Sequence, residues 1–406
     1  MAGNKTVILI GTVDTKGLEL FFLKEQVIAA GYPALLMDVG VHRQPKIAAD
    51  ILASDVARSI GEDIETLRSM PRGEAVEKMS NAAALYLMQL VSDNKAYGVI
   101  GMGGSGGTTI CAAAMRGLPY GIPKLLVSTL ASGNTRWHIG ISDIVMMPSI
   151  LDIGGLNPML RMVLTNAAGA IAGMVQYHKP YAPSGKPVVS FTMYGTTTPG
   201  VSATRNAVEK AGFETWIFHA SGVGGRTMER MIDLGYVKGV VDMTLAEIGA
   251  HLVGGLHDAG PKRLEAAGEA GIPQLIIPGA VDTIVLPPRD QVPEKFNGRI
   301  LNYHNPTMTT MRTEPAENTI IGEFIARKLN AAQGPVKVLF PWGGLSSIDH
   351  PGKIFYFPEA NQALFVSLKK NLDSRIELIE DEHHLDDPQF AQRAANIFLS
   401  MMNQPK

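Results

Sequence analysis

The sequence is poor in cysteine, in aromatic residues and in charge. Of its 406 residues one is a cysteine, three are tryptophans, and 18% are charged. The single cysteine, Cys111, excludes an internal disulfide and is typical of a reducing compartment, because oxidising compartments favour paired cysteines. We interpret Cys111 as a small buried apolar residue rather than a reactive thiol. The sequence therefore predicts a cytoplasmic protein.

The chain also lacks a strong net charge and a long apolar run. Its formal net charge of −2 gives no general attraction for nucleic acid or for an anionic membrane surface. The most apolar stretch, residues 162–178, contains Thr165, Asn166 and Gln176 and falls short of the ~20 predominantly apolar residues of a membrane span. We predict that it is a buried helix whose small residues pack within its domain or across a dimer interface. The sequence predicts no nucleic-acid partner and no membrane partner.

A glycine-rich segment, residues 96–109, is the most informative feature that is present. Its sequence, AYGVIGMGGSGGTT, carries a short apolar run into the glycines, and a helix-forming stretch follows at about residues 108–116. Glycine permits positive φ and close approach of the backbone to a ligand, and a helix N-terminus offers unpaired N–H groups. The segment therefore predicts an anion site, with phosphate as the expected ligand. The residues predicted to contact it are Gly101, Gly103, Gly104, Ser105, Gly106, Gly107 and Thr108.

Three motifs compete for this segment, and their spacing separates them. Gly101, Gly103 and Gly106 match G-x-G-x-x-G, but that dinucleotide fingerprint follows the first strand of its unit, whereas this segment follows the third predicted strand. A Walker loop is excluded because Gly107 occupies the position of its lysine. The G-x-S-x-G nucleophile elbow of α/β-hydrolases also fits, with Ser105 as the nucleophile between a strand and a helix. A phosphate site and a serine hydrolase both stay open on local pattern.

Short apolar runs alternate with longer helical patterns in both halves of the chain, which is typical of parallel sheets covered by helices. Three prolines within residues 180–187 interrupt this pattern. We therefore predict an α/β protein with two Rossmann-like doubly wound domains in tandem, residues 1–182 and 183–406. The predicted strands are residues 6–13, 34–39, 98–102, 124–129 and 143–148, and then 188–194, 214–219, 239–243, 274–278, 336–340 and 376–379.

Two further turns are expected beside the glycine-rich segment. In a sheet of order 2-1-3-4-5 the first and third strands are neighbours at the switch point where ligands bind. Lys16 could then supply the charge that Gly107 lacks, and Asp14 could hold Mg²⁺ through water. The alternatives are a solvated lysine and a simple helix cap. The predicted binding residues of the first turn are Thr12, Asp14, Thr15 and Lys16, and those of the turn after the fourth strand are Ser128, Thr129, Ser132 and Gly133.

The second half offers weaker candidates. Arg226 follows two glycines and could bind a carboxylate or phosphate, while Glu247 and His304 lie in polar segments. These three are the candidate catalytic residues, although each could equally be structural. His251 and His257 are six residues apart, which does not fit a zinc pair on one helical face, and no zinc site is predicted.

The motifs run in an order that resembles a known family. The chain is similar to the ATP-binding amino-terminal domain of the plant tobamovirus resistance protein and its single-domain bacterial and fungal relatives of uncharacterised function. The resemblance is carried by residues 11–16 (GTVDTK), 101–108 (GMGGSGGT), 127–133 (VSTLASG), 152–157 (DIGGLN), 218–222 (FHASG), 253–255 (VGG), 304–306 (HNP) and 311–313 (MRT). It implies two Rossmann-like halves, a nucleotide near the first glycine loop and a homodimer, but no reaction. The chain departs from the family pattern at Leu245 and Ala250.

These observations favour an ATP-dependent enzyme that acts on a small metabolite. ATP, with Mg²⁺, would bind the first domain, and the metabolite would lie in an interdomain cleft facing Arg226 and Glu247. A nucleotide-binding regulator or partner protein without turnover is the first alternative. A serine hydrolase that uses Ser105 is the second.

Overall fold

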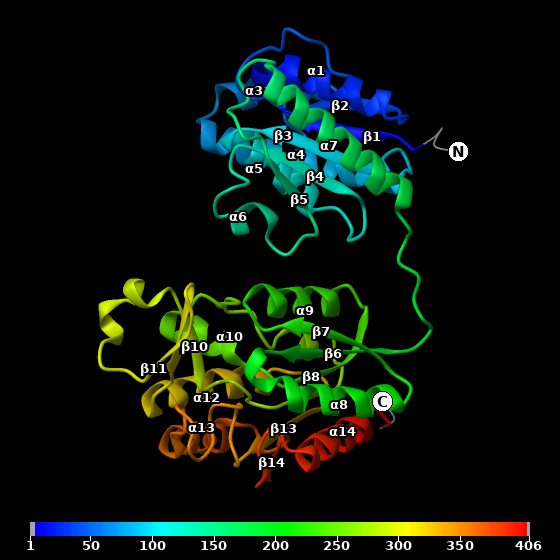
Figure 1. Cartoon of the computed structure of the whole chain (residues 1–406). Coiled ribbons are helices and arrows are strands. Elements are labelled where there is room, and N and C mark those ends of the chain that lie inside the picture. Colours follow the sequence, from blue (N-terminus) through cyan, green and yellow to red (C-terminus); the bar gives the residue numbers. More distant parts are fainter. Residues whose placement is uncertain (1–4, 404–406) are drawn as a thin grey trace. The chain divides into compact units, whose positions relative to one another are not determined.

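The computed structural model describes residues 5–403, and the chain divides into two compact units between Ala182 and Pro183 (Figure 1). The first unit is built on a five-stranded parallel sheet of order β2-β1-β3-β4-β5. Its strands are rich in apolar residues, as parallel strands buried on both faces must be. They are β1 (Val7–Gly11), β2 (Ala34–Asp38), β3 (Gly98–Gly103), β4 (Lys124–Ser128) and β5 (Val145–Pro148).

Helices cover both faces of this sheet. Successive side chains of a strand point to opposite faces, so Val7 and Leu9 of β1 pack with α1 (Val13–Ala29) and α7 (Pro158–Tyr177). Ile8 and Ile10 pack on the other face with α4 and α5. By length and composition α7 could cross a membrane, but its buried residues belong to this core. The other helices are α2 (Ala53–Arg58), α3 (Ile64–Ser69), α4 (Arg72–Ser92), α5 (Ser105–Arg116) and α6 (Arg136–Ile139).

The second unit repeats this plan on a six-stranded parallel sheet of order β14-β13-β9-β8-β6-β7. One face packs on α8 and α14, and the other packs on α9, α12 and α13. The strands are β6 (Val188–Met193), β7 (Glu214–His219), β8 (Val237–Asp242), β9 (Gln274–Ile276), β13 (Val336–Pro341) and β14 (Glu377–Asp381). The helices are η1 (Gly195–Thr197), α8 (Thr198–Lys210), α9 (Val223–Asp233), α10 (Ala246–Gly249), η2 (Ala250–Gly254), α11 (Ala266–Glu269), η3 (Arg289–Gln291), η4 (Glu294–Phe296), α12 (Pro315–Asn330), α13 (Pro358–Asn371) and α14 (Pro388–Met402).

In both sheets the first strand of the unit is an interior strand and not an edge strand. In each unit the second strand lies on one side of the first strand and the third strand lies on the other, with all neighbours parallel. The predicted fold class, two Rossmann-like doubly wound domains, is confirmed. The order 2-1-3-4-5 assumed for the first unit is also the observed one, so β1 and β3 are neighbours at its switch point.

The structure adds a small antiparallel sheet that the sequence did not predict. It has the order β10-β12-β11 and consists of β10 (Thr283–Leu286), β11 (Leu301–Asn305) and β12 (Met308–Arg312). Strands β11 and β12 contain polar residues such as Asn302 and Thr310, so these two strands do not form the apolar runs on which the prediction relied. Helix α5 also begins at Ser105, not at residue 108 as predicted.

Candidate functional site

A cavity of about 500 Å³ lies in the first unit beside the turns that follow β1 and β3. This is the switch point of the sheet, where doubly wound folds bind ligands. Its floor is apolar and includes Met70 and Ile110. The predicted site residues that line it are Thr12, Asp14, Thr15, Lys16, Gly104, Ser105, Gly106 and Gly107.

The N-terminus of α5 opens into this cavity. Gly104 is the residue before the helix and provides no side-chain cap. No described residue accepts a hydrogen bond from the backbone N–H of Ser105, Gly106 or Gly107. Three N–H groups and the positive end of the helix dipole therefore face the cavity, which is the arrangement that binds anions.

The glycines of this loop allow close packing because they have no side chain. None of the five predicted glycines has a positive φ, so the expectation that the loop needs left-handed backbone is wrong. The strand instead runs directly into α5, and a Cβ on Gly103 would lie 2.6 Å from the backbone of Gly107 and Thr108. Gly103 must be a glycine because the first turn of α5 packs against it. Gly101 lies deeper, where a Cβ would press on Cys111 and Leu126.

Three other helices at the carboxyl edges of the sheets, α1, α8 and α9, receive a carboxylate from the protein itself. Asp38 accepts the N–H of Val13 at the start of α1 (3.0 Å). Asp386 accepts the N–H of Gly200 in α8 (3.0 Å). Glu247 does the same for α9, as described below. Helix α5 differs from these three because its N-terminus has no internal anion, which favours an external one.

Basic side chains surround this helix terminus. Lys16 lines the cavity, and its Nζ donates to the carbonyl of Ile153. Arg68 and Arg72 also line the cavity, and Nη2 of Arg72 lies 3.4 Å from the position of a Cβ on Gly106. Sequence reasoning missed both arginines, because they come from α3 and the start of α4 and belong to no motif.

The two carboxylate oxygens of Asp14 differ in their hydrogen bonding. Its Oδ2 accepts the backbone N–H groups of His42 (2.9 Å) and Arg43 (3.2 Å), while its buried Oδ1 has no hydrogen-bond partner among the described residues. No group of three or more metal-ligating side chains occurs in residues 5–403. A cation here would therefore need oxygens from a nucleotide or from water in addition to Asp14.

The turn after β4 contacts the glycine-rich loop and does not line the cavity. Thr108 Oγ1 donates to the carbonyl of Gly103 (3.0 Å) and lies 2.6 Å from Ser128 Oγ, and both side chains are fully buried. The Thr129 hydroxyl lies 4.0 Å from the position of a Cβ on Gly104. Ser132 and Gly133 follow in the next loop and do not line the cavity. This turn positions the glycine loop, whereas the turns after β1 and β3 face the ligand space.

Comparison with known protein families shows which family the chain belongs to. The N-terminal and C-terminal domain models of the uncharacterised protein family UPF0261 match residues 5–180 and 186–402. The chain belongs to the UPF0261 family. A UPF0261 protein of Clostridium tetani is 42% identical over 99% of this chain and 100% of its own length. The ToMV resistance protein Tm-1(GCR237) of Solanum lycopersicum is 38% identical over 98% of this chain, which spans 56% of that protein. The family predicted from the motifs is therefore confirmed.

A solved structure in the comparison gives no further guide. The UDP-GlcNAc 2-epimerase of Neisseria meningitidis bound to UDP-GlcNAc shares 11% identity, with 67% of this chain and 82% of that chain covered and a TM-score of 0.23.

In the second unit of this UPF0261 chain, Glu247 is fully buried. Its Oε1 accepts the N–H groups of Gly222 (2.6 Å) and Gly225 (3.0 Å), and its Oε2 pairs with Nε of Arg263 (2.8 Å). Arg263 also pairs with Glu229 and Asp242. These are the contacts of a structural carboxylate. Arg226 donates from Nε to the carbonyl of Gly222 (3.0 Å), and His304 lies exposed on β11.

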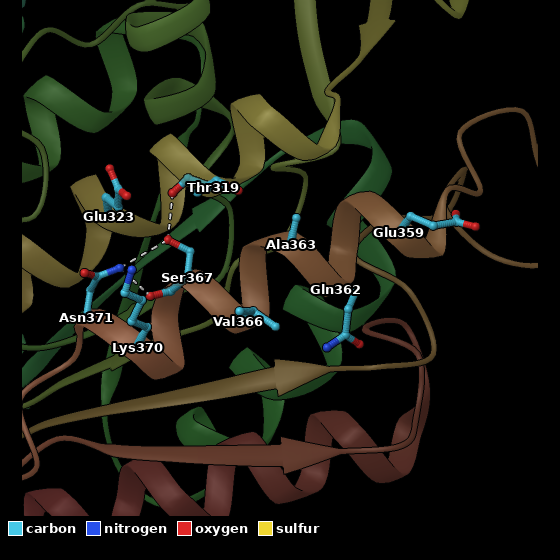
Figure 2. Close-up of a pocket in the computed structure, with 9 residues that line it drawn as sticks. All are labelled: Thr319, Glu323, Glu359, Gln362, Ala363, Val366, Ser367, Lys370 and Asn371. Carbon is cyan, nitrogen blue, oxygen red and sulfur yellow. Dashed lines mark hydrogen bonds between the residues drawn. The ribbon is translucent and has the colours of Figure 1, made fainter.

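A second hollow, of about 450 Å³, lies between α12 and α13 (Figure 2). Ser367 donates to the carbonyl of Thr319 (2.7 Å), and Asn371 donates to the carbonyl of Ser367 (2.8 Å). A Cβ on Gly322 would lie 2.7 Å from Ser367, so the two helices touch here. The Ser367–Thr319 hydrogen bond joins the two helices, and we interpret the hollow as a packing groove.

Proposed function

We propose that the first unit binds ATP with Mg²⁺. The observation that carries this proposal is the uncapped N-terminus of α5 in a cavity lined by Lys16, Arg68 and Arg72. Backbone N–H groups and basic side chains together are the usual partners of a polyphosphate. The volume of about 500 Å³ lies within the range of small-molecule sites.

Each group has a distinct role in this proposal. The N–H groups of Ser105, Gly106 and Gly107 bind one phosphate, and Lys16 and Arg72 bind the others. Asp14 orients Mg²⁺ through its free Oδ1. Bound Mg²⁺ would neutralise charge on the phosphates. The apolar floor formed by Met70 and Ile110 suits the nucleoside.

ATP turnover on a small metabolite is the activity we favour, with a nucleotide-binding regulator as the alternative. Release of ADP or AMP in the presence of a metabolite library separates these two. A serine hydrolase has less support, because no described histidine or carboxylate forms a hydrogen bond with Ser105 Oγ. We also propose a cytoplasmic location, based on the single and buried Cys111.

Thermal unfolding tests the nucleotide. A ligand that binds only the folded state stabilises it, by about 2.7 kcal/mol at 100 times its Kd. We expect Mg-ATP to raise the melting temperature and NAD to leave it unchanged. Gly106→Val should abolish the Mg-ATP shift, because a branched side chain would occupy the ligand space near Arg72. A shift with NAD and none with Mg-ATP would overturn the proposal.

We further propose a homodimer, which the family resemblance implied. The first unit exposes apolar residues on the neighbouring helices α1 and α7, including Leu18 (65% exposed), Phe21 (44%) and Met162 (49%). Exposed apolar residues on two helices that pack together favour an interface here.

A further inference from the structure

The second unit has a switch point of its own. In its sheet β7 lies on one side of β6 and β8 on the other, so a crevice is expected beyond the carboxyl ends of β6 and β8 (Figure 1). The equivalent place in the first unit holds the cavity described above. The proposed nucleotide site does not use any residue of this second edge.

Three rings gather at this edge. Tyr194 follows β6, and its ring centroid lies 5.6 Å from that of His219, the last residue of β7, in a stacked arrangement. His257 meets the Tyr194 ring edge-on at 5.8 Å. Gly222 (φ +85°) fixes this arrangement, since a Cβ there would lie 2.7 Å from the carbonyl of Asp258. The loop after β7 is thus held against the segment that carries His257.

Three buried polar atoms in this part of the second unit lack hydrogen-bond partners. Nδ1 of His257, Oγ1 of Thr196 and Oδ1 of Asp282 are buried and have no hydrogen-bond partner among the described residues. Asp282 is fully buried, and its other oxygen accepts hydrogen bonds from Ser346 (2.8 Å) and Thr283 (3.0 Å). Buried polar atoms are nearly always paired, so unpaired atoms at a switch point indicate a missing ligand or ordered water.

Electrostatics argue against an anionic ligand here. The N-termini of α8 and α9 already hold the carboxylates of Asp386 and Glu247. Burial and the neighbouring His219 lower the pKa of His257 to about 4, so this ring is neutral at pH 7. Burial and the charge of Asp282 raise the pKa of Tyr194 to about 12, so its hydroxyl keeps its proton. The edge therefore offers neutral hydrogen-bonding groups on aromatic rings.

We propose that Tyr194, His219 and His257 form a second small-molecule site, for a neutral compound that carries hydroxyl or carbonyl groups. The Tyr194 hydroxyl donates to an oxygen of the ligand, and His257 Nδ1 and Thr196 Oγ1 complete its hydrogen bonds. The rings of Tyr194 and His219 pack against its carbon skeleton. This site is independent of nucleotide binding in the first unit.

The test uses the full chain with ¹³C-labelled histidine, followed by NMR of the ring carbons. The neutral probes are dihydroxyacetone, D-ribose and D-glucose, and the anionic probes are inorganic phosphate and malonate. His219→Gln and His257→Gln assign the two signals, and His304, exposed on β11, is the internal control. We expect at least one neutral probe to shift His219 and His257 saturably, with His304 unmoved, whether or not Mg-ATP is present.

Tyr194→Phe keeps the ring and removes the hydroxyl, so it should fold and should weaken the neutral probe by roughly 2- to 12-fold, the loss of one hydrogen bond. Tyr303→Phe, which alters an exposed tyrosine of β11, should have no effect. The proposal is overturned if no neutral probe moves both rings, if phosphate or malonate moves them more strongly, or if Tyr194→Phe binds as the wild type does. Because the probes are tested with and without Mg-ATP, their binding can be interpreted even if the nucleotide proposal fails.

Discussion

At the scale of single residues, Lys16 and Arg72 decide how the proposed phosphates are held. Lys16→Ala removes a charge-assisted hydrogen bond worth ~1.5 to 3 kcal/mol, so ATP should bind roughly 10- to 150-fold more weakly. Arg72→Gln should weaken ATP in the same direction, because its guanidinium lies beside Gly106. AMP should be affected little if both side chains reach only the outer phosphates. Titration calorimetry of the wild type and of both variants, each with ATP and with AMP, measures these affinities.

Lys95→Ala is the matched control, since Lys95 is an exposed lysine of the same unit that pairs with Asp93 away from the cavity. Unchanged ATP affinity in Lys16→Ala would exclude the first turn from the site. In that case the role of Lys16 would be to hold the loop after β5 in place through its hydrogen bond to the carbonyl of Ile153.

Arg263 is a second residue whose role can be measured. Its guanidinium pairs with three carboxylates in the core of the second unit, and its side chain is 1% exposed. Removal of one partner from a buried ion pair costs about 3–5 kcal/mol, because the remaining charges stay buried without compensation. Arg263→Met should therefore destabilise the second unit by at least this amount in urea, followed by the fluorescence of Trp216 and Trp342. Arg226→Met, which alters a less buried arginine, should cost much less, and equal losses would contradict a structural role for the cluster.

At the scale of elements, the start of α1 should make stability depend on pH. Burial raises the pKa of Asp38 to about 6, against the hydrogen bonds from Gly40 and Val13. Between about pH 4 and 6 the folded state binds more protons than the unfolded state, so the contribution of Asp38 to stability falls as pH rises through this window. The loss is up to about 3 kcal/mol for a shift of about two units.

Asp38→Asn removes this titration and keeps one oxygen acceptor for the helix. Urea denaturation of both proteins at pH 4.5 and 6.5, followed by circular dichroism, should show that the stability of the wild type relative to the variant falls as pH rises. A difference that stays constant or grows with pH would contradict the assigned direction.

At the scale of the whole molecule, the exposed face of α1 and α7 predicts self-association. Light scattering after size exclusion should give twice the mass of the chain. Phe21→Glu should give a monomer, because it places a charge within the apolar face. Leu85→Glu, on a still more exposed residue of α4, should leave the dimer intact. A monomeric wild type, or equal effects of the two variants, would exclude this interface.

The sequence by itself determined the parallel sheets and the neighbouring turns of the first site. Apolar runs such as residues 7–11 must be buried on both faces, which requires helices on both sides, and the glycine pattern marks a strand that runs into a helix. Strands with polar residues, such as β11, gave no such signal.

Only the tertiary structure decided which helix N-termini stay open. The carboxylates at the N-termini of α1 and α8 come from far along the chain, 25 residues away for Asp38 and 186 for Asp386, and no local sequence pattern predicts them. Folding likewise brought Arg72 to the glycine loop and gathered Tyr194, His219 and His257 at one edge. Local sequence determines strands and turns because their hydrogen bonds and packing periods are short-range. The chemistry of each edge depends on charges and rings that meet only when the whole sheet has formed.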